Sequence, residues 1–334
     1  ENDFPYLNTA ISKEPVWQKR TNSQVSQKGF IQELYLRQAK SIASARVWYE
    51  NADRNLPSSM LIQQPNLKET QSDESLRTML DYDLFGGLNK YSFTGAWLMN
   101  RLNYTNSLAS IDSRNFSETL VLKASMQRHI DEFTNLKVSL NEEVNYIKSN
   151  NYDGNTTRNT LALTASAERN ANGRIGALLL LREILDTRSF LIPDFSVGLQ
   201  YRIVDGRDYF LKTNISRNSK IPSMNDMFWV PGGNPDLKNE YAFIYEITGE
   251  VNQMFASLMA MKLDLSVFRN NIKDLIQWHQ GEYSYWTADN IKSVNSSGLE
   301  SSFSLKSSLN KLAAGLSANY SYTRASTTAS HIVN

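Results

Sequence analysis

Residues 136–146 read LKVSLNEEVNY, and the apolar side chains in this stretch fall on even positions. Leu136, Val138, Leu140 and Val144 are apolar, whereas the odd positions between them carry Lys, Ser, Asn and Glu. Successive side chains of a β-strand point to opposite faces, so this stretch predicts a strand with one apolar and one polar face. The same alternation recurs at 197–203, 209–216 and 312–322. The chain is therefore predicted to be all-β.

Two architectures produce this pattern: a soluble sandwich, whose apolar face packs on a second sheet, and a membrane barrel, whose apolar face meets lipid. Soluble strands average about five or six residues, whereas a tilted spanning strand needs about 9–11. Stretches at 117–127, 135–147, 241–251 and 298–309 reach the longer figure. The polar faces also carry bulky charged side chains that suit a water-filled interior: Arg46, Lys137, Glu143, Arg202, Lys212 and Glu246. Both features favour the barrel.

The links between predicted strands alternate between short and long. Short links are expected near 39, 84–87, 128–134, 170–173, 205–207, 252–257 and 308–311. Long links are expected near 51–74, 101–116, 149–158, 185–194, 217–240 and 270–290. Outer-membrane barrels have short periplasmic turns and longer extracellular loops. The links therefore predict about fourteen antiparallel strands in up-and-down order, with both chain ends interrupting a larger barrel. A weaker pattern at 4–11 would add another strand.

Composition argues against several other classes of protein. The 334 residues carry a formal net charge of +1 and no cysteine. Disulfide frameworks and thiolate metal sites are therefore excluded, and nothing predicts a nucleic-acid partner. The longest apolar run, 175–181, is much shorter than the about 20 residues of a membrane-spanning helix. His129, His279 and His331 lie far apart in sequence, so neither a metal site, a cofactor nor an enzyme activity is expected.

A more specific signal lies at 214–240, which reads NISRNSKIPSMNDMFWVPGGNPDLKNE. It resembles the part of TonB-dependent outer-membrane receptors where a strand ending in Ser-Arg leads to an "aPs-nel" segment and then to "GNPdLkPE". Asn239 departs from the pattern, because the family usually has proline there. The resemblance continues in the family's order at 245–249, 268–276, 295–300 and 320–323, so that strong similarity covers roughly 203–323. Asn and Asp bond to nearby backbone and Pro fixes φ, so the motif is interpreted as structural. Its residues are Arg217, Pro222, Gly233, Asn234, Pro235, Asp236, Leu237 and Glu240.

The resemblance implies a transmembrane antiparallel barrel of twenty-two strands, of which residues 1–334 form a part. An N-terminal plug domain and the last strands would lie outside this chain. The implied location is the outer membrane of a Gram-negative bacterium, with membrane lipid, the plug, TonB and a nutrient as partners. The nutrient implied is a cobalamin or other corrinoid, or a ferric siderophore. A plugless passive porin and a soluble all-β binding module are the alternatives.

The 217–240 link carries an apolar cluster, although a surface link should be polar. Exposed apolar clusters often mark interaction sites. Ligand contact is therefore predicted for Met227, Phe228 and Trp229, and for Tyr285 and Trp286 on the next long link. The alternative is that the link folds inward and packs on its own side chains or on the plug. A third tryptophan, at position 278, is expected in the aromatic belt at the membrane interface.

Overall fold

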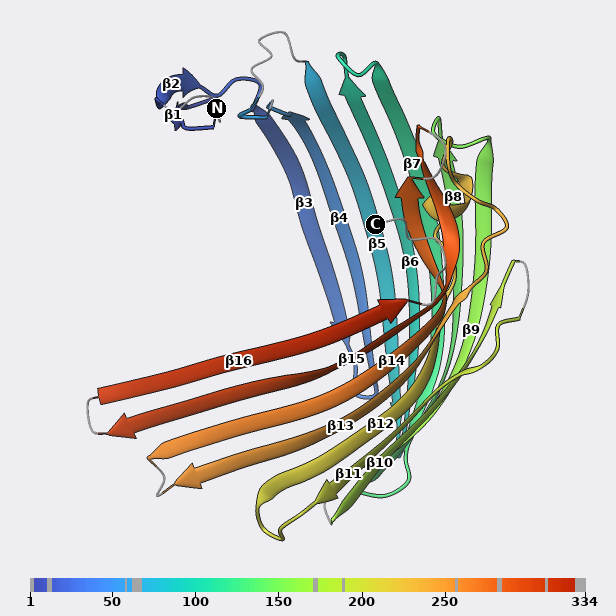
Figure 1. Cartoon of the computed structure of the whole chain (residues 1–334). Coiled ribbons are helices and arrows are strands. Elements are labelled where there is room, and N and C mark those ends of the chain that lie inside the picture. The colour runs from blue at the N-terminus through green and yellow to red at the C-terminus, as the bar shows by residue number, and fades with distance from the viewer. Residues whose placement is uncertain are drawn as a thin grey trace. The chain divides into compact units, whose positions relative to one another are not determined.

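The computed structural model describes residues 3–10, 14–57, 59–61, 68–170, 174–187, 190–255, 258–280, 284–309 and 312–327. Within these residues the chain forms strands and one short helix (Figure 1). The N-terminal strands are β1 (Pro5–Asn8), β2 (Val16–Lys19), β3 (Val25–Arg37), β4 (Ser41–Asn55), β5 (Glu69–Gly86), β6 (Asn89–Asn106), β7 (Ile111–His129) and β8 (Thr134–Ser149). They are followed by β9 (Asn155–Arg169), β10 (Ile175–Asp186), β11 (Asp194–Arg202), β12 (Asp208–Lys220), α1 (Met224–Phe228), β13 (Glu240–Phe255), β14 (Met259–Gln280), β15 (Trp286–Leu309) and β16 (Leu312–Thr327).

The main sheet has 14 strands, and its order runs from β16 to β3 without a crossover. Each strand is hydrogen-bonded to its neighbours in sequence, so the predicted up-and-down antiparallel topology is confirmed. The additional strand expected at 4–11 forms only as β1, and it does not join this sheet. Instead, β1 pairs with β2 in a separate two-stranded antiparallel sheet.

The chain divides into two compact units, and the first comprises Glu1–Phe85, Tyr91–Ala124 and Asn141–Thr160. In this unit Leu34 of β3 pairs with Ala45 of β4, which pairs with Leu80 of β5. Leu34 is 63% exposed and Leu80 is 65% exposed. The neighbouring residue of β4 points to the opposite face, where Arg46 forms an ion pair with Asp81 at 2.5 Å. One face is thus apolar and exposed, and the other is charged.

The second unit comprises Gly86–Lys90, Ser125–Leu140 and Leu161–Asn334. A row of paired residues crosses β11 to β16, from Leu199 through Ile247 and Val267 to Tyr322. These four side chains are exposed. The adjacent row on the other face is polar throughout: Gln200, Lys212, Thr248, Ser266, Glu300 and Ser321. A sandwich would bury the apolar row under a second sheet, so its exposure supports the membrane barrel.

Among the described residues there is no helix with the length and apolar character to cross a membrane.

The predicted alternation of link length is only partly correct. The links at 56–68, between β4 and β5, and at 221–239, between β12 and β13, are long as expected. The links expected at 101–116, 149–158 and 270–290 are much shorter, at 107–110, 150–154 and 281–285. Their polar sequences continue the paired strands instead of forming loops, because pairing satisfies every backbone donor and acceptor. The short links near 170–173, 252–257 and 308–311 lie partly outside the described residues.

Candidate functional site

The 221–239 link leaves β12 next to a buried arginine. Arg217 is 6% exposed, and its Nη1 donates to the carbonyl oxygens of Ile192 at 2.7 Å and Pro193 at 2.9 Å. Its guanidinium carbon lies 4.5 Å from the ring centroid of Tyr241 and 6.0 Å from that of Phe243. Charge-assisted hydrogen bonds and cation–π contacts are strongest where water is excluded. Arg217 therefore ties β12 to β13 and to the 187–193 link.

A buried carboxylate lies beside this arginine. Oδ2 of Asp194, at the start of β11, accepts from Nη2 of Arg182 at 2.6 Å and from Oγ of Ser219 at 2.9 Å. Its Oδ1 lies 3.8 Å from Nη1 of Arg217. A buried ion costs several kcal/mol unless it is paired, and Asp194 meets two cations. The pairs connect β10, β11 and β12.

Glu240 fixes the other end of the 221–239 link, where β13 begins. It is buried at the first position of β13. Its Oε1 accepts from Nζ of Lys220 at 2.9 Å and from the backbone N–H of Ile276 at 2.9 Å. The last residue of β12 and the first residue of β13 are therefore joined both to each other and to β14.

The short helix α1 is held by one carboxylate. Ser223 is its N-cap, with Oγ accepting from the N–H of Asp226 at 3.1 Å. Asp226 Oδ2 accepts in turn from the N–H of Ser223 at 2.9 Å, which completes a capping box. Asp226 Oδ1 accepts the indole N–H of Trp278 on β14 at 2.8 Å. Met224 and Met227 are buried, so α1 lies with an apolar side against the protein.

The protonation of Asp226 reflects these contacts. Burial acts to raise the pKa of its carboxyl, but the hydrogen bonds from Ser223 and Trp278 favour the ionised form. The hydrogen bonds prevail, and they hold the pKa of Asp226 below its usual range. The ionised carboxylate thus helps to fix α1 against β14.

A close backbone approach follows α1. Gly232 has φ of +109°, and a Cβ atom there would lie 1.9 Å from the carbonyl oxygen of Trp286. Its own carbonyl accepts the N–H of Ala288 at 2.8 Å. The N–H of Gly233 donates to the carbonyl of Trp229 at 2.7 Å. Only glycine fits this approach of the link to β15.

The Asn-Pro-Asp-Leu segment then forms a turn. Asn234 Oδ1 accepts the N–H of Asp236 at 3.0 Å, and its carbonyl accepts the N–H of Leu237 at 3.3 Å. Leu237 is buried, whereas Pro235 is exposed. Asn290 of β15 accepts from the N–H of the next residue, Lys238, at 2.8 Å and donates to its carbonyl at 3.1 Å. Pro222 is fully buried at the opposite end of the link.

The residues predicted to contact ligand differ in accessibility. Met227 is 6% exposed and lies on the buried side of α1, so it is not accessible to a ligand. Phe228, Trp229 and Tyr285 are half-buried. Trp286 is 58% exposed and Val230 is 55% exposed. The close contact of Gly232 with Trp286 brings the link and the start of β15 together. We call Phe228, Trp229, Val230, Tyr285 and Trp286 the aromatic surface.

Several residues that hold this region have no signal in the sequence. Trp278 is expected in the membrane belt, but its indole bonds to Asp226, which lies 52 residues earlier. Asn290 and Lys238 are also 52 residues apart. Such pairs depend on the register of β13, β14 and β15, which the alternation of a single strand does not determine.

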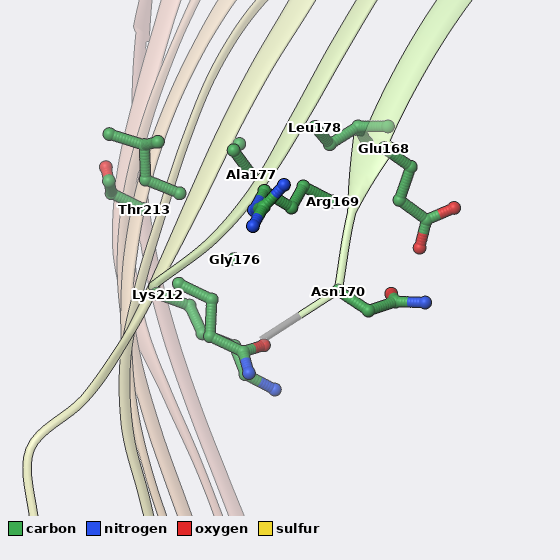
Figure 2. A pocket seen from close by; sticks show the side chains of 11 residues that line it. Glu168, Arg169, Asn170, Gly176, Ala177, Leu178, Lys212 and Thr213 are labelled. Atoms are coloured by element: carbon green, nitrogen blue, oxygen red, sulfur yellow. The ribbon is translucent and has the colours of Figure 1, made fainter. Parts of the chain in front are cut away.

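A separate hollow of about 280 Å³ is lined by residues at the end of β9, near the start of β10 and within β11 and β12 (Figure 2). Its walls include Gly176 and Gly198, which contribute no side chains. Two cations line it, and both are engaged. Lys212 pairs with Glu250, and Arg169 donates to Thr134 Oγ1 at 3.1 Å. Among the described residues the hollow therefore offers room without a free cation, and its one carboxylate is that of Glu168.

The described residues contain no group of three or more His, Asp or Glu side chains that could hold a metal ion. His279 on β14 instead lies 2.9 Å from Asp289 Oδ2 through its Nε2. His331 lies outside the described residues.

Comparison with known proteins gives a consistent result. The family model "TonB dependent receptor-like, beta-barrel" matches residues 8–333. A vitamin B12 transporter, BtuB of Vibrio vulnificus (strain YJ016), is 34% identical over 82 residues, which cover 24% of this chain and 13% of that protein.

Solved structures show the same fold. The siderophore receptor PirA from Pseudomonas aeruginosa superposes with a TM-score of 0.74 at 15% identity, covering 93% of this chain and 59% of that chain. A double mutant of the Serratia marcescens hemophore receptor HasR, in complex with its hemophore HasA and heme, gives 0.75 at 10% identity, covering 96% and 57%. The chain thus spans less than two thirds of the length of these proteins.

Proposed function

Since the chain belongs to the family of TonB-dependent receptor β-barrels, we propose that it forms the wall and surface links of an outer-membrane receptor that captures a scarce nutrient for active uptake. The observation that carries this proposal is the division of the sheet into an exposed apolar face and a charged face. A wall of this kind suits lipid on one side and an aqueous interior on the other.

The aromatic surface is the proposed place of ligand capture. It lies at the end of β12 to β15 from which the long 221–239 link emerges. Aromatic side chains offer large apolar area with few rotatable bonds, so they bind ring systems at a small entropic cost. Exposed Trp286 and Val230 form its accessible part, and half-buried Phe228 and Trp229 continue it.

The nutrient class proposed is a corrinoid such as cobalamin, or a ferric siderophore. The match to a vitamin B12 transporter supports the first, and the likeness to a siderophore receptor supports the second. Both ligands are large and combine apolar with polar surface, and their apolar parts fit an aromatic platform.

Uptake by the full-length protein tests the function. When expressed in a Gram-negative host that lacks its own cobalamin and siderophore receptors, the full-length protein should restore growth on nanomolar concentrations of either nutrient. Deleting TonB from that host should abolish the growth. A passive porin would instead admit small sugars without TonB, and that result would refute the receptor proposal.

The aromatic surface has its own test. In the full-length protein, replacing both Phe228 and Trp229 with alanine should weaken ligand binding at least tenfold, because alanine-truncated aromatic anchors cost about 2 kcal/mol or more. Barrel assembly, followed by heat-modifiable migration in gels, should be unchanged. Tyr320→Ala, at an exposed aromatic of the apolar face of β16, is the matched control. Unchanged affinity in the double variant would leave the link a purely structural role.

A further inference from the structure

A pocket that takes no part in the proposed uptake lies in the first unit, at the ends of β6 to β9. Its volume is about 660 Å³. Three cationic side chains, Arg101, Arg114 and Lys148, line it together with Phe116 and Tyr146. Most of the remaining lining residues are asparagines and a serine. The pocket thus combines positive charge, aromatic rings and amides.

The pocket lies on the apolar face of the sheet. A Cβ atom at Gly95 of β6 would lie 3.8 Å from Cδ2 of Leu122 of β7, so these two positions share a face. Trp97, two residues beyond Gly95, and Leu120, two residues before Leu122, are on that face by strand alternation and are exposed. Arg101 and Phe116 have the same parity as these apolar residues. The basic pocket therefore continues directly from the face assigned to lipid.

Direct contacts connect the strands that build it. The guanidinium carbon of Arg101 on β6 lies 5.8 Å from the ring centroid of Phe116 on β7. The ring of Phe116 meets that of Tyr146 on β8 at 6.5 Å and 69°, edge to face. Aromatic side chains are enriched where a membrane protein meets the headgroup layer. Phe116 and Tyr146 therefore place the headgroup layer at their own height along β7 and β8.

The cations are accessible to a ligand. Arg101 pairs with Glu74 at 2.8 Å and Arg114 with Asp112 at 2.7 Å, and both guanidinium side chains are more than half exposed. Exposed pairs of this kind contribute little stability, so an incoming anion can replace the carboxylates. Lys148 is exposed and forms no ion pair with the described residues. Its ammonium group is the free charge of the pocket.

Besides Glu74 and Asp112, which pair with Arg101 and Arg114, a further acidic residue limits the positive field. Glu118 lies two residues beyond Phe116 on the same face of β7, but it does not line the pocket. The turns at 107–110 and 150–154 lie at the same end of the antiparallel strands as the long 56–68 link. In an outer-membrane barrel the end with the long links faces the cell exterior.

We propose that this pocket binds the phosphorylated headgroup of a glycolipid in the outer leaflet of the membrane. Basic pockets beside a lipid-exposed face bind phosphate headgroups, and long cationic side chains reach the interface while their stems cover apolar surface. Asn103 and Asn155 supply amides for sugar hydroxyls. The continuity of the pocket with exposed Trp97 and Leu120 selects a lipid over a soluble anion.

The test uses the full-length protein, freed of lipid in detergent and titrated with diphosphorylated lipid A, with binding measured by native mass spectrometry. The double variant Arg101→Gln, Lys148→Gln should bind about 30-fold more weakly, and Lys148→Gln alone about 5-fold, at roughly 1 kcal/mol for each basic residue. The single variant breaks no ion pair of the described residues, so its fold is not at risk. Glu118→Gln should bind more tightly.

The matched control is Arg77→Gln, Lys123→Gln, which removes the same charges from the opposite face of β5 and β7. It should leave lipid A binding unchanged. An equal loss of lipid A binding in this control would show that the pocket is not the binding site. If phosphatidylglycerol bound as tightly as lipid A, the pocket would not be specific for a glycolipid. If inorganic phosphate displaced lipid A at the same concentration, the ligand would be a soluble anion and not a lipid. None of these outcomes depends on nutrient uptake.

Discussion

Replacing Arg217 with methionine tests the idea that buried ionic contacts fasten the surface link to the barrel. Methionine keeps an unbranched apolar stem that can still pack on Tyr241, but it removes the charge and all hydrogen-bond donors. The carbonyl groups of Ile192 and Pro193 would then lose donors at 2.7 and 2.9 Å. Asp194 would keep Arg182 but lose its second cation, 3.8 Å away.

The expected cost follows from these contacts. Hydrogen bonds to a charged group contribute about 1.5–3 kcal/mol each, and breaking a buried ion pair costs about 3–5 kcal/mol. The two estimates describe overlapping contacts of one side chain, so they are not added. We expect Arg217→Met to lower the free energy of unfolding by about 3–5 kcal/mol. Arg217→Lys keeps the charge but not the planar fork, and should lose about 1.5–3 kcal/mol.

Reversible urea unfolding of the full-length protein in detergent micelles, followed by tryptophan fluorescence, measures this difference. Arg207→Met is the control, because the side chain of Arg207 is exposed and, among the described residues, its guanidinium donates only to Gln253 Oε1, at 2.7 Å. It should change stability by less than about 1 kcal/mol. A loss below about 1 kcal/mol for Arg217→Met as well would show that the buried network contributes no net stability, as occurs for some buried ion pairs.

Three further predictions concern the link itself. Trp278→Phe removes the indole donor to Asp226 and should speed amide exchange in α1 about tenfold, at about 1.4 kcal/mol for the lost bond; unchanged exchange would contradict the contact. The folded pKa of Asp226 is lowered, so its stabilising contribution is complete above the unfolded pKa of about 3.9 and is lost as pH falls through the folded value. The indole N–H resonance of Trp278 should therefore shift only below about pH 4, and Asp226→Asn should remove that titration. Gly232→Ala would drive a Cβ atom into the carbonyl of Trp286 and should abolish ligand binding without preventing assembly, whereas Gly206→Ala, with positive φ but open space around it, should leave binding intact.

Side-chain alternation was sufficient to predict the sheet. Leu136, Val138 and Leu140 are exposed, as expected for a lipid-facing row. A period of two assigns each side chain of a strand to one of two faces, so only the surroundings of the apolar face, lipid or a second sheet, had to be inferred. Link lengths were predicted poorly. Asn103 and Asn106 of the predicted 101–116 link have polar side chains and low strand propensity, yet both belong to β6. Neighbouring strands override propensity by pairing the backbone.

The candidate site was predicted in part. The motif around Asn234 and Gly233 identified the link, and both residues make the local backbone contacts that turn residues make. The sequence could not show that Met227 is buried, because an apolar run of a few residues has no period that separates inward from outward positions. The partnership of Asp226 with Trp278 also depends on where β14 passes, which is a property of the register.

The position of the buried ionic contacts suggests why one link can combine exposure with order. A long link that carries aromatic side chains into water loses conformational entropy whenever it binds a ligand, unless it is already fixed. Here Arg217 fixes the chain before the link, Glu240 fixes it after the link, and Asp226 fixes α1 in between. None of the three belongs to the aromatic surface. If the aromatic surface binds the nutrient as proposed, exposed side chains such as Val230 and Trp286 can differ between receptors of different ligand specificity, while the three contacts that fix the link stay the same.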